Sequence, residues 1–459
     1  MLSLAIALFV TAWVGFMLCK KYKPQGVLFF AGIILLVCTA ALGTSSMVPP
    51  KQDTGFIWFN IFVFVKNLFS TELAGLGLTI MSIGGFVRYM ENCGANRALV
   101  EVAATPLKHI KSPMLIMVAG YLIGQVVDLF IPSHAGLGLL LMLTIYPIMV
   151  ASGMNKLTAV AIIVTAKFTD IGPLSSNAIL AAKTAGLDPV TYFIQYQLYA
   201  VLPAIIVVGI AHYFIQPWWE RKEARGNINV DAEIDESENT DNADRQRSRI
   251  YAILPMLPLA LVILFSPFFH TGIKLDVVSA MILSTVVAMI FEFIRTRNAK
   301  QVMNDIMKFF EGMAKQFRVV VSLIISAELF GKGLVSIGAI DSLIGFTQGG
   351  SLDLQVIVLV ISFIMVACAF IMGSGNAAFF AFASLAPKIA EFLHVDPVLI
   401  LLPMELSAGF GRCMSPITPA IVAMASIAGV SPFHVAKRCA IPVALGFIAH
   451  LTSIYYFFL

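Results

Sequence analysis

The sequence is poor in charged residues. Asp, Glu, Lys and Arg make up only 12% of its 459 residues, whereas a soluble domain carries about 25%. This deficit excludes a soluble globular protein, because too few charges remain to cover a surface that faces water. Hydrophobic residues make up 59% of the chain instead, in runs that recur from end to end. Runs of about 20 apolar residues span the roughly 30 Å of bilayer hydrocarbon, so the sequence predicts an all-α polytopic membrane protein.

The sequence also lacks the patterns of metal sites and disulfide frameworks. Its six cysteines form no CxxC pair and its seven histidines form no HExxH cluster. Basic residues interleaved with aromatic residues are missing too, so the net charge of +4 does not indicate a nucleic-acid partner. We therefore predict no catalytic residue, no metal site and no cofactor. The first apolar run, 2–18, has no basic n-region and no cleavage site, and we interpret it as a retained helix.

Two halves of the chain resemble each other across one long polar stretch, from about Glu220 to Arg249. The segment PLSSNAILAAKTAGLDP aligns without a gap on PITPAIVAMASIAGVSP. Chance similarity between apolar sequences is the alternative, but several matches in the same order argue against it. Paired repeats are typical of secondary transporters, which bind substrate between the repeats near the bilayer midplane. A further set matches at one constant offset: Phe86, Arg88, Gly94 and Ala95 with Phe330, Lys332, Gly338 and Ala339.

Basic loop residues predict the topology, because such loops gather on the cytoplasmic side. They share that side if 112–131 and 136–153 are the arms of a re-entrant hairpin. A second hairpin is expected at 354–373 and 377–393. Five spans lie between the hairpins, which makes the repeats inverted, and the whole chain has ten spans with both termini in the periplasm. The five spans are expected near 155–187, 192–215, 250–268, 275–295 and 316–334.

This topology predicts a division into scaffold and transport parts. Scaffold helices are expected at 1–111 and 250–353. Each is followed by a transport unit that holds a hairpin and a broken helix, at 112–215 and 354–459. A cytoplasmic linker is expected at 216–249.

Small and polar residues interrupt the apolar pattern at four matched places, 132–136, 169–177, 373–376 and 411–419. Irregular backbone at membrane depth is tolerated only where it is buried in protein or lines a watery cavity. Each break starts a half-helix whose free N–H groups suit a carboxylate. For any single Ser or Thr the alternative is a helix-bonded interface residue, and for the glycine it is close helix packing. We predict that these residues bind substrate: Ser133, Ser175, Ser176, Asn177, Ser374, Gly375, Asn376, Ser415 and Thr418.

Arg412 lies in the last break and is a further predicted substrate-binding residue. Its guanidinium group can pair with a substrate carboxylate through two N–H groups. The alternative is a structural ion pair with Glu405, seven residues earlier.

Three titratable residues near the first two breaks are candidates for coupling transport to an ion, Na⁺ or H⁺. Asp170 lies in the second break, and its alternative role is a local ion pair with Lys167. Asp128 and His134 flank the first hairpin tip, and they could instead bond to each other or to backbone.

At these residues the chain resembles the anaerobic C4-dicarboxylate uptake C family, within the ion transporter superfamily. The matching strings are KYKPQGVL, CGANRALV, GLGLLLM, GSGNAAFFAF, GRCMSPIT and GVSPFHVAKRCAIPVALGF. The resemblance implies uptake, exchange or efflux of succinate, fumarate and malate across a bacterial inner membrane. It also implies an elevator mechanism in a homodimer. The first tip departs from the family pattern, with Ser-His-Ala, and Pro419 stands where the first half has Ser176, so the two carboxylate clamps are expected to be unequal.

Two other functions stay open at this point. A carrier of the same fold for another small organic anion or an amino acid is the runner-up, because hydroxyl donors do not distinguish a substrate with two carboxylates from a substrate with one. A channel or a membrane-embedded enzyme is the third possibility. A hydrolase would need a nucleophile beside a positioned base, and the sequence offers only breaks that suit binding loops.

Overall fold

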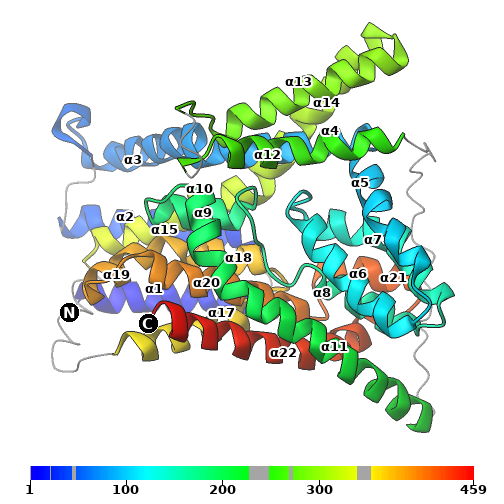
Figure 1. The fold of residues 1–459 in the computed structure, drawn as a ribbon. Helices are drawn as coiled ribbons and strands as arrows, with labels where there is room; N and C mark the ends of the chain where they lie inside the picture. Colours follow the sequence, from blue (N-terminus) through cyan, green and yellow to red (C-terminus); the bar gives the residue numbers. More distant parts are fainter. Residues whose placement is uncertain (1, 21, 44–47, 227–247, 268–271, 339–352) are drawn as a thin grey trace.

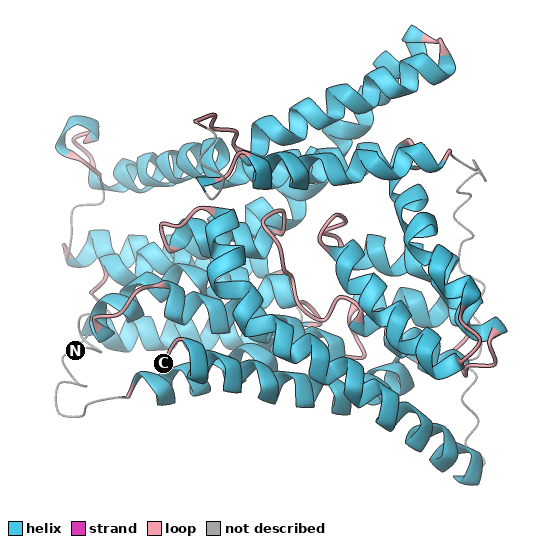
Figure 2. Ribbon diagram, in the orientation of Figure 1, coloured by secondary structure: helices cyan, strands magenta, loops and turns pink. Residues whose placement is uncertain are grey.

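A computed structural model describes residues 2–20, 22–43, 48–226, 248–267, 272–338 and 353–459. These segments are helices joined by loops (Figure 2). Nine helices among them are long and apolar enough to cross a membrane. A helix bonds its own backbone groups, which is why apolar sequence of this length folds as helix in lipid.

The first half contains three spans, a hairpin, a broken helix and a final span. Its helices are α1 (Leu2–Cys19), α2 (Pro24–Leu42), η1 (Pro50–Gln52), α3 (Ile57–Glu72), η2 (Leu73–Gly77), α4 (Leu78–Asn92), α5 (Ala95–Ala104), η3 (Thr105–His109), α6 (Pro113–Asp128), α7 (His134–Ala151), α8 (Lys156–Thr165), α9 (Ser176–Thr184), α10 (Pro189–Tyr192), η4 (Phe193–Gln197) and α11 (Leu198–Gly226).

The second half follows the same order. Its helices are η5 (Arg249–Met256), α12 (Leu257–Leu264), α13 (Val277–Thr296), α14 (Ala299–Gln316), η7 (Phe317–Val321), α15 (Ser322–Ser336), α17 (Leu354–Met372), α18 (Gly375–Phe382), η8 (Ala383–Leu385), α19 (Ala386–Leu393), α20 (Val398–Met414), α21 (Pro419–Ala428) and α22 (Pro432–Phe457).

Matching irregularities confirm the internal repeat. The long helix 57–92 contains a π-helical turn at Leu73–Gly77, and the long helix 299–336 contains one at Phe317–Val321. Their starts differ by 317 − 73 = 244 residues, the same offset that separates Phe86 from Phe330. A π-helical turn is a rare, local feature, so its recurrence at this offset is not explained by shared hydrophobicity. Ala339, the last residue of the matched set, lies outside the described residues.

Both predicted hairpins are present. Helices α6 and α7 form the first, and α17 with α18 and α19 forms the second. In Figure 1 they lie at opposite ends of the bundle, with their tips directed toward its middle. The two termini lie together at one end, and the C-terminal end of α11 lies at the other. The described residues hold a helix or an interrupted helix at each of the ten predicted spans (α1, α2, α3–α4, α8–α9, α10–α11, η5–α12, α13, α14–α15, α20–α21 and α22). Seven of these are among the nine long apolar helices, and the other two of the nine are the hairpin helices α7 and α17. The number of spans stays a prediction.

Packing divides the helices into two groups. In the first, α2 packs along α15, and α4 packs along α14 and α13. In the second, α11 packs along α22, α17 packs along α20, and α8 packs on α22. We call these the α4–α14 group and the α11–α22 group. The second also includes the elements that pack on its helices: α6, α7, α9, α18, η8, α19 and α21. The α4–α14 group includes the uppermost helices in Figure 1, and the lower part of the view shows the α11–α22 group.

Two helices extend beyond their expected ends. Helix α11 continues to Gly226, into the segment expected as linker from 216. Its polar residues there are bonded by other helices: Thr158 donates to Glu220 at 2.5 Å and Arg438 donates to Glu223 at 2.6 Å. The polar residues after 216 led to the prediction of a linker. The structure continues the helix there because side chains of other helices bond these polar residues. Helix α14 begins at Ala299 rather than near 316, because its charged residues lower the hydropathy that marked the span.

Candidate functional site

The two broken helices cross at their breaks. The break between α8 and α9 covers residues 166–175, and the break between α20 and α21 covers 415–418. A Cβ built on Gly409 of α20 would lie 2.4 Å from the backbone oxygen of Phe168, so only glycine allows this approach. The rings of Phe168 and Phe410 also pack together, with centroids 5.0 Å apart. The crossing brings the two breaks into one site.

Local sequence explains why both helices stop. At the first break Gly172 has a left-handed φ of 97°, and the following Pro173 has no backbone N–H. At the second break Pro416 has the same effect. The Thr418 hydroxyl donates to the backbone oxygen of Arg412 at 2.7 Å, which satisfies a carbonyl that would otherwise have no helical partner.

Four half-helices begin at the predicted breaks. At each hairpin tip a serine side chain caps the half-helix that follows. The Ser133 hydroxyl oxygen accepts from the backbone N–H of Gly136 at 3.2 Å, and that of Ser374 accepts from Ala377 at 3.2 Å. These two serines therefore hold the half-helices in place. At the other two breaks, α21 begins with Pro419, which has no N–H to offer a ligand. The second broken helix therefore has one N–H fewer at this start, and the inequality of the two carboxylate clamps stays a prediction.

The second hairpin tip lies directly against α20. A Cβ on Gly375 would lie 2.8 Å from the backbone oxygen of Ala408 and 3.3 Å from Cδ of Arg412. The close packing considered for this glycine is thus present. It brings the next residue, Asn376, to the guanidinium group, and Arg412 Nη1 donates to Asn376 Oδ1 at 3.3 Å.

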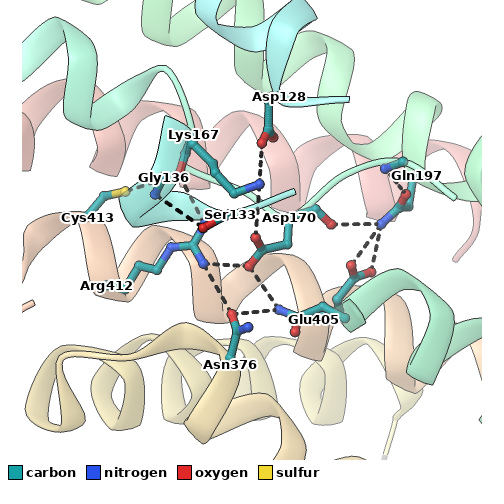
Figure 3. Close-up of polar contacts among 12 residues, drawn as sticks. Asp128, Ser133, Gly136, Lys167, Asp170, Gln197, Asn376, Glu405, Arg412 and Cys413 are labelled. Atoms are coloured by element: carbon teal, nitrogen blue, oxygen red, sulfur yellow. Dashed lines mark hydrogen bonds and ion pairs between the residues drawn. The ribbon is translucent and has the colours of Figure 1, made fainter. Parts of the chain in front are cut away.

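Asp170 is the centre of a polar network that joins both halves (Figure 3). Its Oδ2 accepts from Arg412 Nη1 at 2.5 Å and from Asn177 Nδ2 at 2.9 Å. Asn177 Nδ2 also lies 3.4 Å from Asn376 Oδ1. One carboxylate is therefore bound by the first broken helix, the second broken helix and, through Asn376, the second hairpin.

Lys167 extends this network to the first hairpin. Its Nζ donates to Asp128 Oδ1 at the end of α6 and lies 3.4 Å from Asp170 Oδ1. The local pair of Lys167 and Asp170 is present as part of this larger arrangement. Asp128, Lys167, Asp170 and Arg412 are 0%, 3%, 7% and 4% exposed. Two buried cations and two buried anions thus balance to a formal charge of zero.

Glu405 does not pair with Arg412, so this expected alternative is wrong. Its Oε2 accepts from the Tyr192 hydroxyl at 2.6 Å, and its Oε1 accepts from Gln197 Nε2 at 2.8 Å. Gln197 also accepts from the backbone N–H of Gly172 at 3.0 Å. The partner of Arg412 is Asp170, 242 residues earlier in the chain, a pairing that sequence spacing does not reveal.

Several buried polar atoms of the site, like some elsewhere, have no hydrogen-bond partner within the part of the chain that the structure describes. Buried polar groups in folded proteins are nearly all hydrogen-bonded, so a cluster of exceptions marks where a ligand or water supplies the missing partner. The atoms are Asp128 Oδ2, His134 Nδ1, Thr169 Oγ1, Asn177 Oδ1, Arg412 Nε and Ser415 Oγ.

Some of the predicted residues are linked by hydrogen bonds in the site. The others lie at the ends of the half-helices around it. Hydrogen bonds link Asp128, Asp170, Asn177, Asn376, Arg412 and Thr418. The remaining predicted residues begin, cap or end the half-helices: Ser133, His134, Ser175, Ser176, Ser374, Gly375 and Ser415.

Sequence reasoning missed Tyr192 and Gln197. Gln197 reaches the site from a third π-helical turn, Phe193–Gln197. Helix α22, the repeat counterpart of α10 and α11, is described as one helix over Pro432–Phe457. Because this turn does not recur in the second half, comparison of the repeats offered no signal for it.

Comparison with known sequences identifies the relatives of this chain. Residues 2–458 match the family model described as DcuC, the C4-dicarboxylate anaerobic carrier. A probable anaerobic C4-dicarboxylate transporter DcuC of Vibrio cholerae is 36% identical over 449 residues, which cover 98% of this chain and 96% of the relative. The anaerobic C4-dicarboxylate transporter DcuC of Escherichia coli K12 is 34% identical over 448 residues, which cover 97% and 95%.

Comparison with solved structures identifies the fold. The YdaH transporter of Alcanivorax borkumensis, described as having an unusual topology, aligns with a TM-score of 0.60 and 15% identity, over 94% of this chain and 98% of that one. MtrF of Neisseria gonorrhoeae, described within a class of antimetabolite efflux pumps, aligns with a TM-score of 0.58 and 11% identity, over 94% of each chain. The fold is that of polytopic transporters.

Proposed function

The chain belongs to the family of C4-dicarboxylate anaerobic carriers, and from this premise we propose that it is a secondary active transporter of succinate, fumarate and malate. The observation that carries the proposal is the convergence of matched helix breaks on two buried cations, Lys167 and Arg412. Cations at membrane depth are costly and mark substrate or ion pathways. A carboxylate of the substrate can pair with Arg412, whose guanidinium group lies where the two broken helices meet.

The polar atoms without partners support an anionic substrate of this size. Arg412 Nε is a donor and Ser415 Oγ can donate, and both belong to the second broken helix and its break. Thr169 Oγ1 offers a third hydroxyl from the first break. A carboxylate accepts several hydrogen bonds at once, so one bound substrate can satisfy donors from both halves.

We propose an elevator mechanism in which the α11–α22 group moves against the α4–α14 group. The site residues belong to the α11–α22 group, which corresponds to the expected transport units 112–215 and 354–459. The scaffold is then formed from 1–111 and 250–353, and we propose that two copies assemble through it as a homodimer. Contacts between the groups include a hydrogen bond from Lys183 of α9 to Thr79 of α4, at 3.2 Å.

We further propose that the coupling ion is H⁺ rather than Na⁺. Both carboxylates at the centre of the site already face cations: Asp128 faces Lys167, and Asp170 faces Lys167 and Arg412. A carboxylate beside a cation is a poor Na⁺ ligand, but it accepts a proton once that cation is taken by substrate. We place the protein in the bacterial inner membrane with both termini in the periplasm.

Uptake by proteoliposomes tests the substrate class. Liposomes preloaded with unlabelled succinate should accumulate labelled succinate by exchange, and fumarate and malate should compete. Acetate and lactate should not, because each offers a single carboxylate. Equal competition by a monocarboxylate would favour the runner-up function, a carrier of the same fold for another small anion.

A disulfide tests the elevator mechanism. A Cβ on Gly331 of α15 would lie 3.5 Å from Cβ of Ser384 in η8, within the usual Cβ separation of about 3.5 to 4.5 Å in a disulfide. In a variant without native cysteines, Gly331→Cys with Ser384→Cys should link the two groups on oxidation, stop transport, and recover on reduction. The single variants are the controls. Full transport by the oxidised, cross-linked protein would exclude movement between the groups.

A further inference from the structure

The Asp170 carboxylate is bound as a substrate carboxylate would be. Its three nearest charged or amide donors are Arg412 Nη1 at 2.5 Å, Asn177 Nδ2 at 2.9 Å and Lys167 Nζ at 3.4 Å. Two of these residues, Asn177 and Arg412, are ones that the sequence predicts for the substrate. The protein's own side chain therefore occupies the donors that a ligand requires.

Arg412 bonds the Asp170 carboxylate through one nitrogen only, so another carboxylate can replace Asp170. Only Nη1 of the guanidinium group bonds the carboxylate, while Nη2 donates to the backbone oxygen of Lys167 at 3.1 Å and Nε has no partner. A bidentate pair uses two parallel N–H groups and is the stronger arrangement. An incoming carboxylate that engages Nη1 together with the second N–H of Nη2 would bond Arg412 through two N–H groups, whereas Asp170 uses one.

The formal charge of the site limits how a dicarboxylate can bind, because its negative charge must be compensated. With Asp128, Lys167, Asp170 and Arg412 all ionised, the buried site is neutral, and a dicarboxylate would bring two negative charges into it. An uncompensated buried charge costs several kcal/mol, and a group in this position is neutralised instead. The charge of the bound state is reduced most directly by protonating Asp170, which has lost Arg412 and keeps only the more distant Lys167, at 3.4 Å.

We propose that the substrate displaces Asp170 from Arg412 and that Asp170 then takes up a proton from water. In this step the Arg412 to Asp170 ion pair is replaced by an Arg412 to substrate ion pair, and one proton passes from solvent to the Asp170 carboxylate. No other bond forms or breaks. Asp170 is thus an internal counter-ion that makes substrate binding and proton binding one event. This inference rests on the proposed function.

The other charged groups around Asp170 do not meet the same condition. Lys167, in the same segment, keeps Asp128 of α6 as its partner when Arg412 changes partner. Glu405 of α20 is held by the Tyr192 hydroxyl and by Gln197 rather than by a cation. His134 of α7 faces the site, but its Nδ1 bonds no residue that the substrate would displace. Of these acidic and titratable side chains, Asp170 is the one bonded to Arg412, and it loses that bond on substrate binding.

Calorimetry of succinate binding tests this inference directly. Heats measured for the purified protein in several buffers of different ionisation enthalpy give the number of protons taken up per succinate. Near neutral pH we expect about one proton for the wild type and none for Asp170→Asn. Asp170→Asn should also bind succinate at least about tenfold more tightly at a pH near 8, because the competing carboxylate is gone. Glu405→Gln, which removes a buried carboxylate that is bonded by Tyr192 and Gln197 rather than by a cation, is the matched control and should retain the proton uptake.

The outcomes separate this inference from the proposed function. A wild-type protein that binds no C4-dicarboxylate at any pH would refute the proposed function. Succinate binding without proton uptake would leave that function intact and overturn the inference, and this result needs no variant. Proton uptake that persists unchanged in folded Asp170→Asn, or weaker binding by that variant, would also overturn it.

Discussion

Two arginines are buried in the α11–α22 group, and they are bonded in different ways. Arg438 of α22 holds Glu223 with two N–H groups, Nε at 3.2 Å and Nη2 at 2.6 Å. Its Nη1 donates to Gln216 Oε1 at 3.0 Å and lies 3.1 Å from the Thr158 hydroxyl. Arg412 has one N–H on Asp170, and its Nε has no partner.

The difference separates a structural arginine from a binding one. Arg438 connects α8, α11 and α22 and has partners on all three of its nitrogens, so it offers nothing to a ligand. Arg412 is equally buried but incompletely bonded, in a site where other polar atoms lack partners too. Burial and charge alone do not distinguish the two, because both are costly at membrane depth. The hydrogen-bond inventory distinguishes them.

Loss of Arg438 should have the largest effect on stability. Arg438→Ala leaves the partly buried Glu223 without its cation and removes the buried contacts to Thr158 and Gln216. Breaking a buried pair costs about 3 to 5 kcal/mol, and we expect a loss near the lower value. We expect little folded protein and a strongly lowered Tm in detergent. Lys437→Ala, which removes the neighbouring contact between Lys437 and the Trp219 ring, 4.9 Å from its centroid, is the control and should cost less than about 1 kcal/mol. Normal folding of Arg438→Ala would contradict the structural role that distinguishes Arg438 from Arg412.

Arg412→Lys should weaken substrate binding without loss of folded protein. Lysine keeps the charge but lacks the planar fork that bonds a carboxylate bidentately. A hydrogen bond to a charged group contributes about 1.5 to 3 kcal/mol, so the Kd for succinate should rise about 10-fold to 100-fold. Binding and Tm are measured on the same preparation. An unchanged Kd would exclude Arg412 from the substrate site. A strongly lowered Tm would show that Arg412, like Arg438, has a structural role.

Glu405 is a third buried charge and should fall between the two arginines. Its partners are Tyr192 and Gln197, both neutral, so Glu405→Gln removes charge while keeping an acceptor oxygen. We expect a loss of stability of about 1 to 2 kcal/mol and a succinate Kd within about threefold of wild type. Glu405→Leu, which removes both acceptors, is the harsher comparison and should lower Tm further. A larger rise in Kd for Glu405→Gln than for Arg412→Lys would transfer the binding role to Glu405.

The hairpin tips should give the smallest effects, equal in the two halves. Ser133→Ala and Ser374→Ala each remove one N-cap hydrogen bond, and such a loss costs about 0.5 to 2 kcal/mol. Thermal unfolding of both variants measures the cost. A change in succinate Kd for only one of them would show that its hydroxyl also contacts substrate.

Much of the fold could be predicted from sequence because hydropathy and repeats carry it. Apolar run length gave the spans, and the alignment of the segments after Pro173 and Pro416 gave the matched breaks. The partner of Arg412 could not be predicted, because Asp170 lies in the other half and meets it only through the crossing at Gly409. The bonding of Glu405 to Tyr192 and Gln197 was hidden for the same reason. Short sequence spacing predicts local pairs, whereas this site is built from distant ones.

A structure of the protein with bound succinate tests the central claim most directly. We expect succinate between the two broken helices, with one carboxylate on Arg412 Nη1 and Nη2 and with Asp170 displaced from the guanidinium group. A different position would contradict the account. The clearest contrary result is succinate in the separate cavity of about 230 Å³ lined by Lys332 and Lys388, with the ion pair of Arg412 and Asp170 unchanged.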